Sequence, residues 1–90
     1  MTAPTAAANP APPRRLFLIE SAAASDALLR ILEPFALQQA ILAAVALDSR
    51  PGAVRVRVEA DGLTDARAET LRWRLVKLPL VTSVALGWQA

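Results

Sequence analysis

Hydrophobic and polar positions alternate most regularly over residues 53–60, where Val54, Val56 and Val58 are separated by charged side chains. This period of two predicts a strand with one buried face and one solvated face. Three further apolar runs predict strands at Leu16–Ile19, Ile41–Leu47 and Val81–Trp88. The run 16–19 is apolar on both faces, as suits a central strand of a sheet.

The segment after the first predicted strand repeats apolar residues at intervals of three and four, which predicts an amphipathic helix. Its core-facing side consists of Leu28, Ile31, Leu32 and Phe35. Ser25 is the expected N-cap, with Asp26 in the first turn, where a negative charge favours the helix dipole. Pro34 lacks a backbone donor, so we expect a kink or an early helix end there.

A second helix is predicted after the turn at Asp61-Gly62, with Thr64 as its N-cap. Its core stripe consists of Ala68, Leu71, Leu75 and Leu78. Pro79 marks its end. On a helical wheel Trp73 lies opposite this stripe, so its side chain is expected to face solvent.

The predicted elements follow the order β-α-β-β-α-β, with a turn at residues 48–52 between the second and third strands. This order favours an α+β fold, the ferredoxin-like sandwich, in which two helices cover one face of a four-stranded antiparallel sheet. Residues 15–90 are expected to form this one domain. Residues 1–14 are rich in alanine and proline and are expected to be a disordered tail.

The composition excludes several kinds of chemistry. The chain has no cysteine and no histidine, so it lacks disulfides, thiolate metal sites and the commonest general base. No paired acids, phosphate-binding glycine loop or nucleophile–base pair is visible, so we expect no enzyme activity, no cofactor and no metal. The longest apolar run, residues 40–47, is far short of the roughly 20 residues that span a bilayer. We therefore expect a soluble, cytoplasmic protein without a membrane partner.

Two stretches of the chain resemble the ACT domain family and, within it, the regulatory small subunit of acetolactate synthase. They are ALLRILEPFALQQAIL at residues 27–42 and RLVKLPLVTSVAL at residues 74–86. Arg30, Phe35 and Lys77 are shared beyond the aliphatic core positions, and the likeness covers residues 16–88. The resemblance implies an effector-binding regulatory module that pairs with a second copy. Its expected partners are a free amino acid and a larger enzyme subunit such as that of acetolactate synthase.

The resemblance also implies where a ligand would bind, which is beside the first strand–helix loop. The candidate contacts are Ser21, Ser25, Asp26, Ala27, Gln39 and Ile41. The chain departs from the family here, because Asp26 and Gln39 replace glycines and Ile41 replaces an asparagine. Asp26 would compete with a bound carboxylate for the same helix N–H groups. A protein-interaction module with a degenerate ligand pocket therefore stays open as an alternative.

A homodimer formed by sheet-edge pairing is expected. The run 41–47 belongs at a sheet edge in this fold, and an apolar edge without charge invites pairing with another chain. A domain of this size also gains stability from association. The candidate interface residues are Ile41, Ala43, Val45, Leu47, Trp73 and Trp88.

A distant alternative is an RNA-binding ferredoxin-like domain, because LFLIES at residues 16–21 faintly resembles a base-stacking strand. The strand at 53–60 has no aromatic residue to continue such a surface, so Phe17 is interpreted as a core residue. Arg55 and Arg57 form a small basic spot that Glu59 interrupts. Nucleic acid is therefore not an expected partner.

Overall fold

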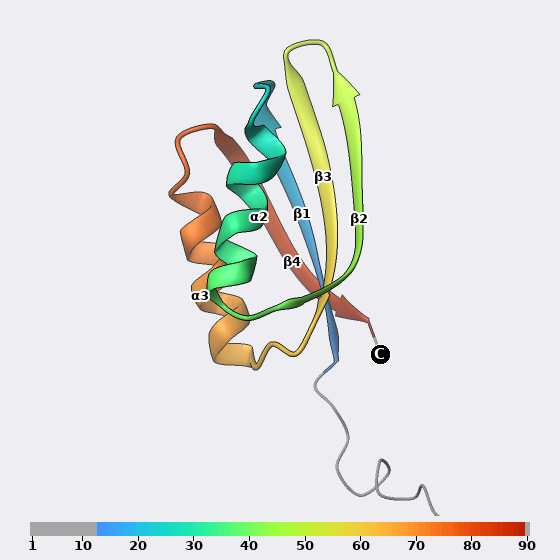
Figure 1. The fold of residues 1–90 in the computed structure, drawn as a ribbon, viewed down its shortest axis with the longest axis vertical. Coiled ribbons are helices and arrows are strands. Elements are labelled where there is room, and N and C mark those ends of the chain that lie inside the picture. The colour runs from blue at the N-terminus through green and yellow to red at the C-terminus, as the bar shows by residue number, and fades with distance from the viewer. Residues whose placement is uncertain (1–12, 90) are drawn as a thin grey trace, which may run out of the picture.

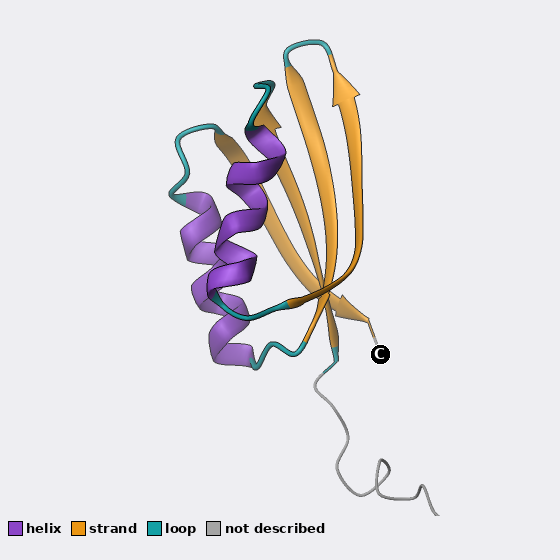
Figure 2. Cartoon of the chain, in the orientation of Figure 1, coloured by secondary structure: helices purple, strands orange, loops and turns teal. Residues whose placement is uncertain are grey.

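Six elements follow one another in the computed structural model, which describes residues 13–89 (Figure 1). They are β1 (Arg14–Ala22), α2 (Ala27–Leu37), β2 (Ile41–Arg50), β3 (Ala53–Asp61), α3 (Asp65–Val76) and β4 (Val81–Gln89). The strands form one sheet in the order β2-β3-β1-β4, and all three neighbouring pairs are antiparallel. Both helices lie on the same face of the sheet (Figure 2). The predicted ferredoxin-like fold is confirmed, whereas the tail prediction falls almost entirely outside the described residues.

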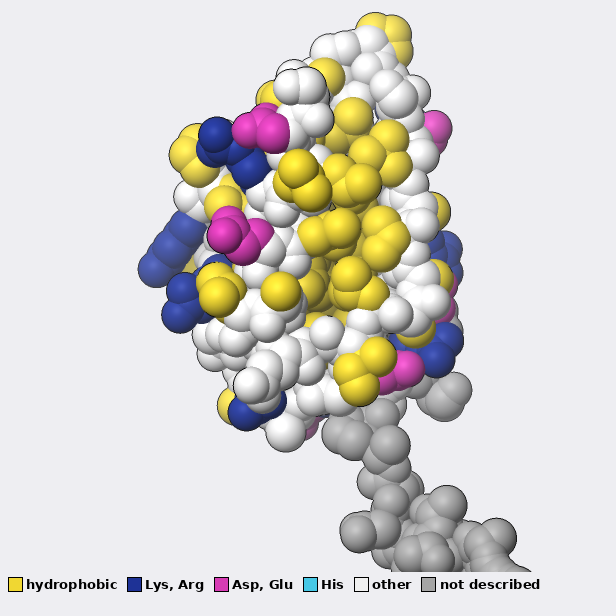
Figure 3. Space-filling view, in the orientation of Figure 1, with side chains coloured by type: hydrophobic (Ala, Val, Ile, Leu, Met, Phe, Trp, Pro, Cys, Tyr) yellow, Lys and Arg dark blue, Asp and Glu magenta, His cyan; other side chains and the backbone are white. Residues whose placement is uncertain are grey.

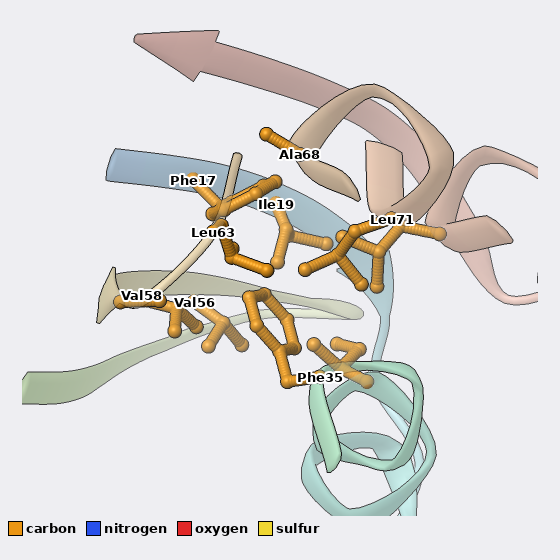
Figure 4. Close-up of a cluster of buried hydrophobic side chains, with 11 residues drawn as sticks. Phe17, Ile19, Phe35, Val56, Val58, Leu63, Ala68 and Leu71 are labelled. Atoms are coloured by element: carbon orange, nitrogen blue, oxygen red, sulfur yellow. The ribbon is translucent and has the colours of Figure 1, made fainter. Parts of the chain in front are cut away.

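The core lies between the two central strands and the two helices (Figure 4). Alternate residues of β3 point toward the helices, and Val56 and Val58 are fully buried. Phe17 of β1 is also fully buried and contacts Phe35 of α2 edge-to-face, with ring centroids 5.0 Å apart. This arrangement confirms that Phe17 is a core residue and that β1 is a central strand.

The predicted start of α3 is also confirmed, because the Thr64 hydroxyl accepts a hydrogen bond from the backbone N–H of Arg67 at 3.2 Å. Ala68 and Leu71 are buried as predicted, and Trp73 on the opposite side is 53% exposed. The hairpin between β2 and β3 is tighter than the sequence indicates. Its strands continue to residues 50 and 53, and Gly52 occupies the turn with a φ of 74°.

The expected N-cap of α2 is wrong, and so is one of the two outcomes expected at Pro34, an early helix end. The N-cap position is held by Asp26 rather than Ser25, and no side chain caps the helix there. The helix also does not end at Pro34 but continues to Leu37. Pro34 is buried and lies in the last turn, where the missing donor frees only the carbonyl of Arg30. Arg30 is exposed, so water can satisfy that carbonyl, which explains why the proline is tolerated.

Strand β2 forms one edge of the sheet, as predicted, and pairs along its length with β3 only. Every one of its ten residues is exposed. Neither helix extends over it, so β2 stands clear of the helical layer (Figure 1). This uncovered strand is one of the two edges of the sheet, the other being β4, at which a partner strand could be added.

Candidate functional site

A ligand is expected beside the loop between β1 and α2, and the serine near the end of β1 and the serine in the loop differ in accessibility. Ser21 is 1% exposed, and its hydroxyl donates to the carbonyl of Ala22 at 2.8 Å. Ser25 is exposed in the turn before α2, whereas Ala27 is buried at the first position of the helix. Ser25 is therefore the hydroxyl of this loop that a ligand can reach.

Asp26 does not use the N–H groups at the start of α2. Its carboxylate instead accepts a hydrogen bond from Nε of Arg30, one turn later, at 2.6 Å. This hydrogen bond holds the pKa of Asp26 below its ordinary value. The carboxylate is therefore ionised near neutral pH, and Arg30 neutralises it on the helix surface.

Gln39 and Ile41 lie at the opposite end of α2 from the loop. Gln39 adopts a left-handed backbone conformation, with a φ of 59°, which glycine adopts more readily than other residues. An eleven-residue helix is roughly 16 Å long, so these two residues do not join Ser25 and Asp26 in one site within a single chain. A site that uses both groups needs a second molecule.

The helix-side face of β2 carries several exposed apolar side chains. Leu42, Val45 and Leu47 lie opposite buried residues of β3 in the register, so they share the face that the helices cover elsewhere. Their exposed fractions are 42%, 40% and 45%. Figure 3 shows hydrophobic side chains gathered beside α2 and over the strands next to it. We call Leu42, Val45 and Leu47 the edge patch.

The other candidate interface residues lie elsewhere. Trp73 lies on α3, which is the helix farther from β2 (Figure 1), so it cannot share an interface with the edge patch in one sheet-edge contact. Ala43 lies at the irregularity in the β2–β3 register, and Ile41 is 65% exposed at the start of β2. The backbone of Trp88 pairs with Arg15, and its side chain lies outside the described part of the structure.

The open face of the sheet contains a hollow of about 650 Å³ whose lining includes the apolar residues Leu18, Ala46 and Ala85. Arg55 lies on its rim and donates to a carboxylate oxygen of Glu20 at 2.7 Å. The second arginine of the basic spot also has a partner, because Arg57 lies 3.5 Å from Glu59. Both cations on this face are therefore paired, which leaves little free positive charge for phosphates.

A second hollow, of about 260 Å³, lies between the C-terminal halves of α2 and α3. Its lining residues are Glu33, Pro34, Leu37, Arg74, Lys77 and Leu78. Sequence reasoning missed this groove, which we call the helix groove. The sequence indication for this groove is Leu37, an exposed apolar residue that continues α2 beyond Pro34. An early helix end at Pro34 would have left Leu37 outside the helix.

The described residues contain no cluster of three or more acidic side chains that could hold a metal ion. Neither α2 nor α3 has both the length and the apolar character that spanning a lipid bilayer requires. The geometry thus offers contact surfaces, namely a free sheet edge, an open sheet face and a groove between two helices.

Such a two-layer βαββαβ unit is the ferredoxin-like arrangement. The chain belongs to the ACT-like domain family, whose model matches residues 11–89. Comparison with curated protein sequences finds no match. The family match covers all of the residues that the structure describes.

Solved structures of the same fold have little sequence in common with this chain. The ACT domain from GTP pyrophosphokinase of Chlorobium tepidum superposes with a TM-score of 0.73 at 14% identity, over 82% of this chain and 96% of that one. The C-terminal domain of the MgtC protein from Mycobacterium tuberculosis superposes with a TM-score of 0.73 at 13% identity, over 90% of this chain and 92% of that one. A formyltetrahydrofolate deformylase from Pseudomonas putida KT2440 superposes with a TM-score of 0.61 at 12% identity, over 86% of this chain and 28% of that one.

Proposed function

We propose that this protein is a non-enzymatic regulatory or accessory module that works as a homodimer and binds an amino acid or a larger enzyme subunit. The observation that carries the proposal is β2, an edge strand whose ten residues are all exposed and whose helix-side face carries the edge patch. An apolar edge strand of this length is otherwise a site of uncontrolled association. Pairing with a second copy would satisfy its free backbone groups and cover the patch.

Dimer symmetry supports an effector site at the same interface. Antiparallel pairing of two β2 strands about a two-fold axis would place the two α2 helices side by side in opposite directions. The start of one α2, with Ser25 and Asp26, would then approach the end of the other, with Gln39 and Ile41. The residues that one chain holds apart would thus meet across two chains.

The amino-acid half of the proposal is tested by thermal unfolding of the full chain with each of the twenty amino acids at millimolar concentration. We expect one or a few of them to raise the melting temperature, because a ligand that binds only the folded state stabilises it. Asp26→Asn should strengthen this response, since it removes a carboxylate from the end of the helix where a ligand carboxylate would bind. No shift with any amino acid in either protein would contradict an amino-acid site.

The alternative is a protein-interaction module whose ligand pocket is degenerate, and one observation favours it. The Asp26–Arg30 ion pair fixes a negative charge at the entrance of the expected site. In that case the dimer would form without any amino-acid response. Mixing the chain with an isolated acetolactate synthase catalytic subunit tests the named enzyme partner, and the absence of a complex in analytical ultracentrifugation would exclude it.

A further inference from the structure

The charges of this protein are almost completely paired, and the exceptions gather in one place. Seven of the ten basic side chains form ion pairs with seven of the eight acidic ones, and all of these lie in the described part of the chain. The basic side chains without such a partner among the described residues are Arg67, Arg74 and Lys77. All three belong to α3 or its C-cap. With the unpaired Glu33 on α2, these three cations account for the net charge of +2.

The unpaired cations adjoin the helix groove. Arg74 and Lys77 line it directly, and Figure 3 shows basic side chains along the α3 side of the molecule. Arg67 is seven residues before Arg74, so it lies two turns away on the same side of the helix. The unpaired carboxylate of Glu33 also lines the groove. The lining thus combines two cations from α3 and its C-cap with one anion from α2.

The inner surface of the groove is apolar. Pro34 and Leu78 line it, and Leu37 beside them is 66% exposed although it belongs to the last turn of α2. Trp73 lies on the same side of α3 as Lys77, four residues before it, and is 53% exposed. A partner that contacts this surface can therefore bury an aliphatic pocket and a tryptophan, the kind of residue that dominates binding energies.

We propose that the helix groove, together with Trp73, is a docking site for an acidic segment of a partner protein that inserts an apolar anchor between α2 and α3. The inference deepens the partner-binding half of the proposed function and rests on it. The partner would bind at the helix groove through an acidic segment with an apolar anchor.

A second copy of this chain does not fit as the occupant. Docking on cations requires free carboxylates, and seven of the eight in this chain are already paired, the eighth being Glu33 in the groove itself. A partner protein with free carboxylates supplies the complementary charge without breaking these pairs. The edge strand β2 lies on the far side of α2 from α3, so homodimer pairing there would leave the α3 side accessible (Figure 1).

Nucleic acid fits less well than an acidic protein segment. Glu33 would repel phosphates, and the aliphatic lining formed by Pro34, Leu37 and Leu78 offers nothing to a sugar–phosphate backbone. The guanidinium of Arg72 also lies 4.7 Å from the centre of the Trp73 ring, where it covers one face that a base would need for stacking.

The test selects peptides from a random twelve-residue phage-displayed library on the full-length chain and measures the binding of synthetic copies by calorimetry. We expect acidic peptides with a leucine, isoleucine or phenylalanine anchor. Arg74→Ala combined with Lys77→Ala should lower the affinity for these peptides about five- to tenfold. The matched control, Arg55→Ala with Arg57→Ala, removes the same charge from the other face of the sheet and should leave affinity within about twofold. Glu33→Gln should tighten binding about twofold, because it removes a repulsive charge.

The proposal is overturned if selection yields no acidic peptides, if the Arg74/Lys77 variant binds them as well as wild type, or if an oligouridylate binds this helix more tightly than the peptides do. The molar mass of the wild-type chain and its response to amino acids are measured on the same preparation. A wild-type chain that is dimeric but selects no acidic peptides would reject the docking site alone. Loss of the dimer and of the amino-acid response would reject the proposed function.

Discussion

Arg15 and Asp65 form an ion pair in which one side chain is 3% exposed and the other 93%, with Nη2 and the carboxylate oxygen 2.8 Å apart. The guanidinium also donates from Nε and Nη2 to the carbonyl of Leu63, at 3.3 and 3.1 Å. A single buried cation at the start of β1 therefore holds the loop that begins α3.

Replacement of Arg15 by methionine should lower the free energy of unfolding by about 1–3 kcal/mol, because the carbonyl of the fully buried Leu63 loses its donors. Asp65→Asn should cost less, since solvent screens the exposed carboxylate. Urea denaturation of the two variants measures the difference. Equal losses would show that the ion pair, rather than the buried hydrogen bonds, is what stabilises the loop.

The edge-to-face pair of Phe17 and Phe35 joins β1 to α2. Each phenylalanine is fully buried, so alanine at either position should lower the free energy of unfolding by about 3–5 kcal/mol. A double-mutant cycle should give a coupling of roughly 0.5–1.5 kcal/mol, because the rings touch. Leu18→Ala is the control, since Leu18 is 38% exposed on the open face. An unchanged stability in Phe17→Ala would support the base-stacking alternative instead.

Stability should be insensitive to pH in the neutral range and should fall in acid. The hydrogen bond from Arg30 lowers the pKa of Asp26, and the hydrogen bond from Arg14 lowers the pKa of Asp61. A pKa that folding depresses contributes stability above the unfolded value of roughly 4, and this contribution is lost as pH falls through the folded value.

With no histidine in the chain, the free energy of unfolding should change little between about pH 8 and 5. Urea titrations over the acid range measure the fall in the free energy of unfolding. In Asp61→Asn this free energy should fall less steeply with decreasing pH. A steep dependence near pH 6.5 would contradict this account.

Two glycines with open space around them should respond differently to alanine. Gly52 has a φ of 74°, and an added Cβ meets nothing within 4 Å, so Gly52→Ala isolates the backbone cost of about 1–2 kcal/mol. Gly87 has equally open surroundings and an ordinary backbone, so Gly87→Ala should be neutral or slightly stabilising. Thermal unfolding of both variants makes the comparison. Equal effects would mean that the turn does not require its glycine.

The fold was predictable from the sequence because its periodicities are local. The alternation around Val56, the stripe containing Leu71 and the cap at Thr64 each follow from a few neighbouring residues. The end of α2 was not predictable in this way. Whether Pro34 ends the helix depends on whether the carbonyl of Arg30 can reach water, and only the packed structure decides that.

The surfaces were harder to predict because they depend on register. Glu20 lies opposite Arg55 only in the observed pairing of β1 with β3, so the neutralisation of the open face is a tertiary property. The burial of Arg15 depends in the same way on where the loop after β3 crosses β1. The candidate ligand residues share a neighbourhood in the sequence, whereas α2 places Asp26 and Gln39 at opposite ends.

The pairing of β2 with a second copy is the claim on which the proposed function depends most. Val45 in the edge patch and Val76 on α3 are matched probes, because both are valines and their exposed fractions are 40% and 41%. A lysine at Val45 would place a charge inside the paired edge, whereas a lysine at Val76 would remain in solvent.

Size-exclusion chromatography with light scattering at micromolar concentration measures the outcome most directly. We expect twice the chain mass for wild type and for Val76→Lys, and the mass of one chain for Val45→Lys. A wild-type protein that elutes with the mass of one chain, or a Val45→Lys variant that stays dimeric, would contradict the account.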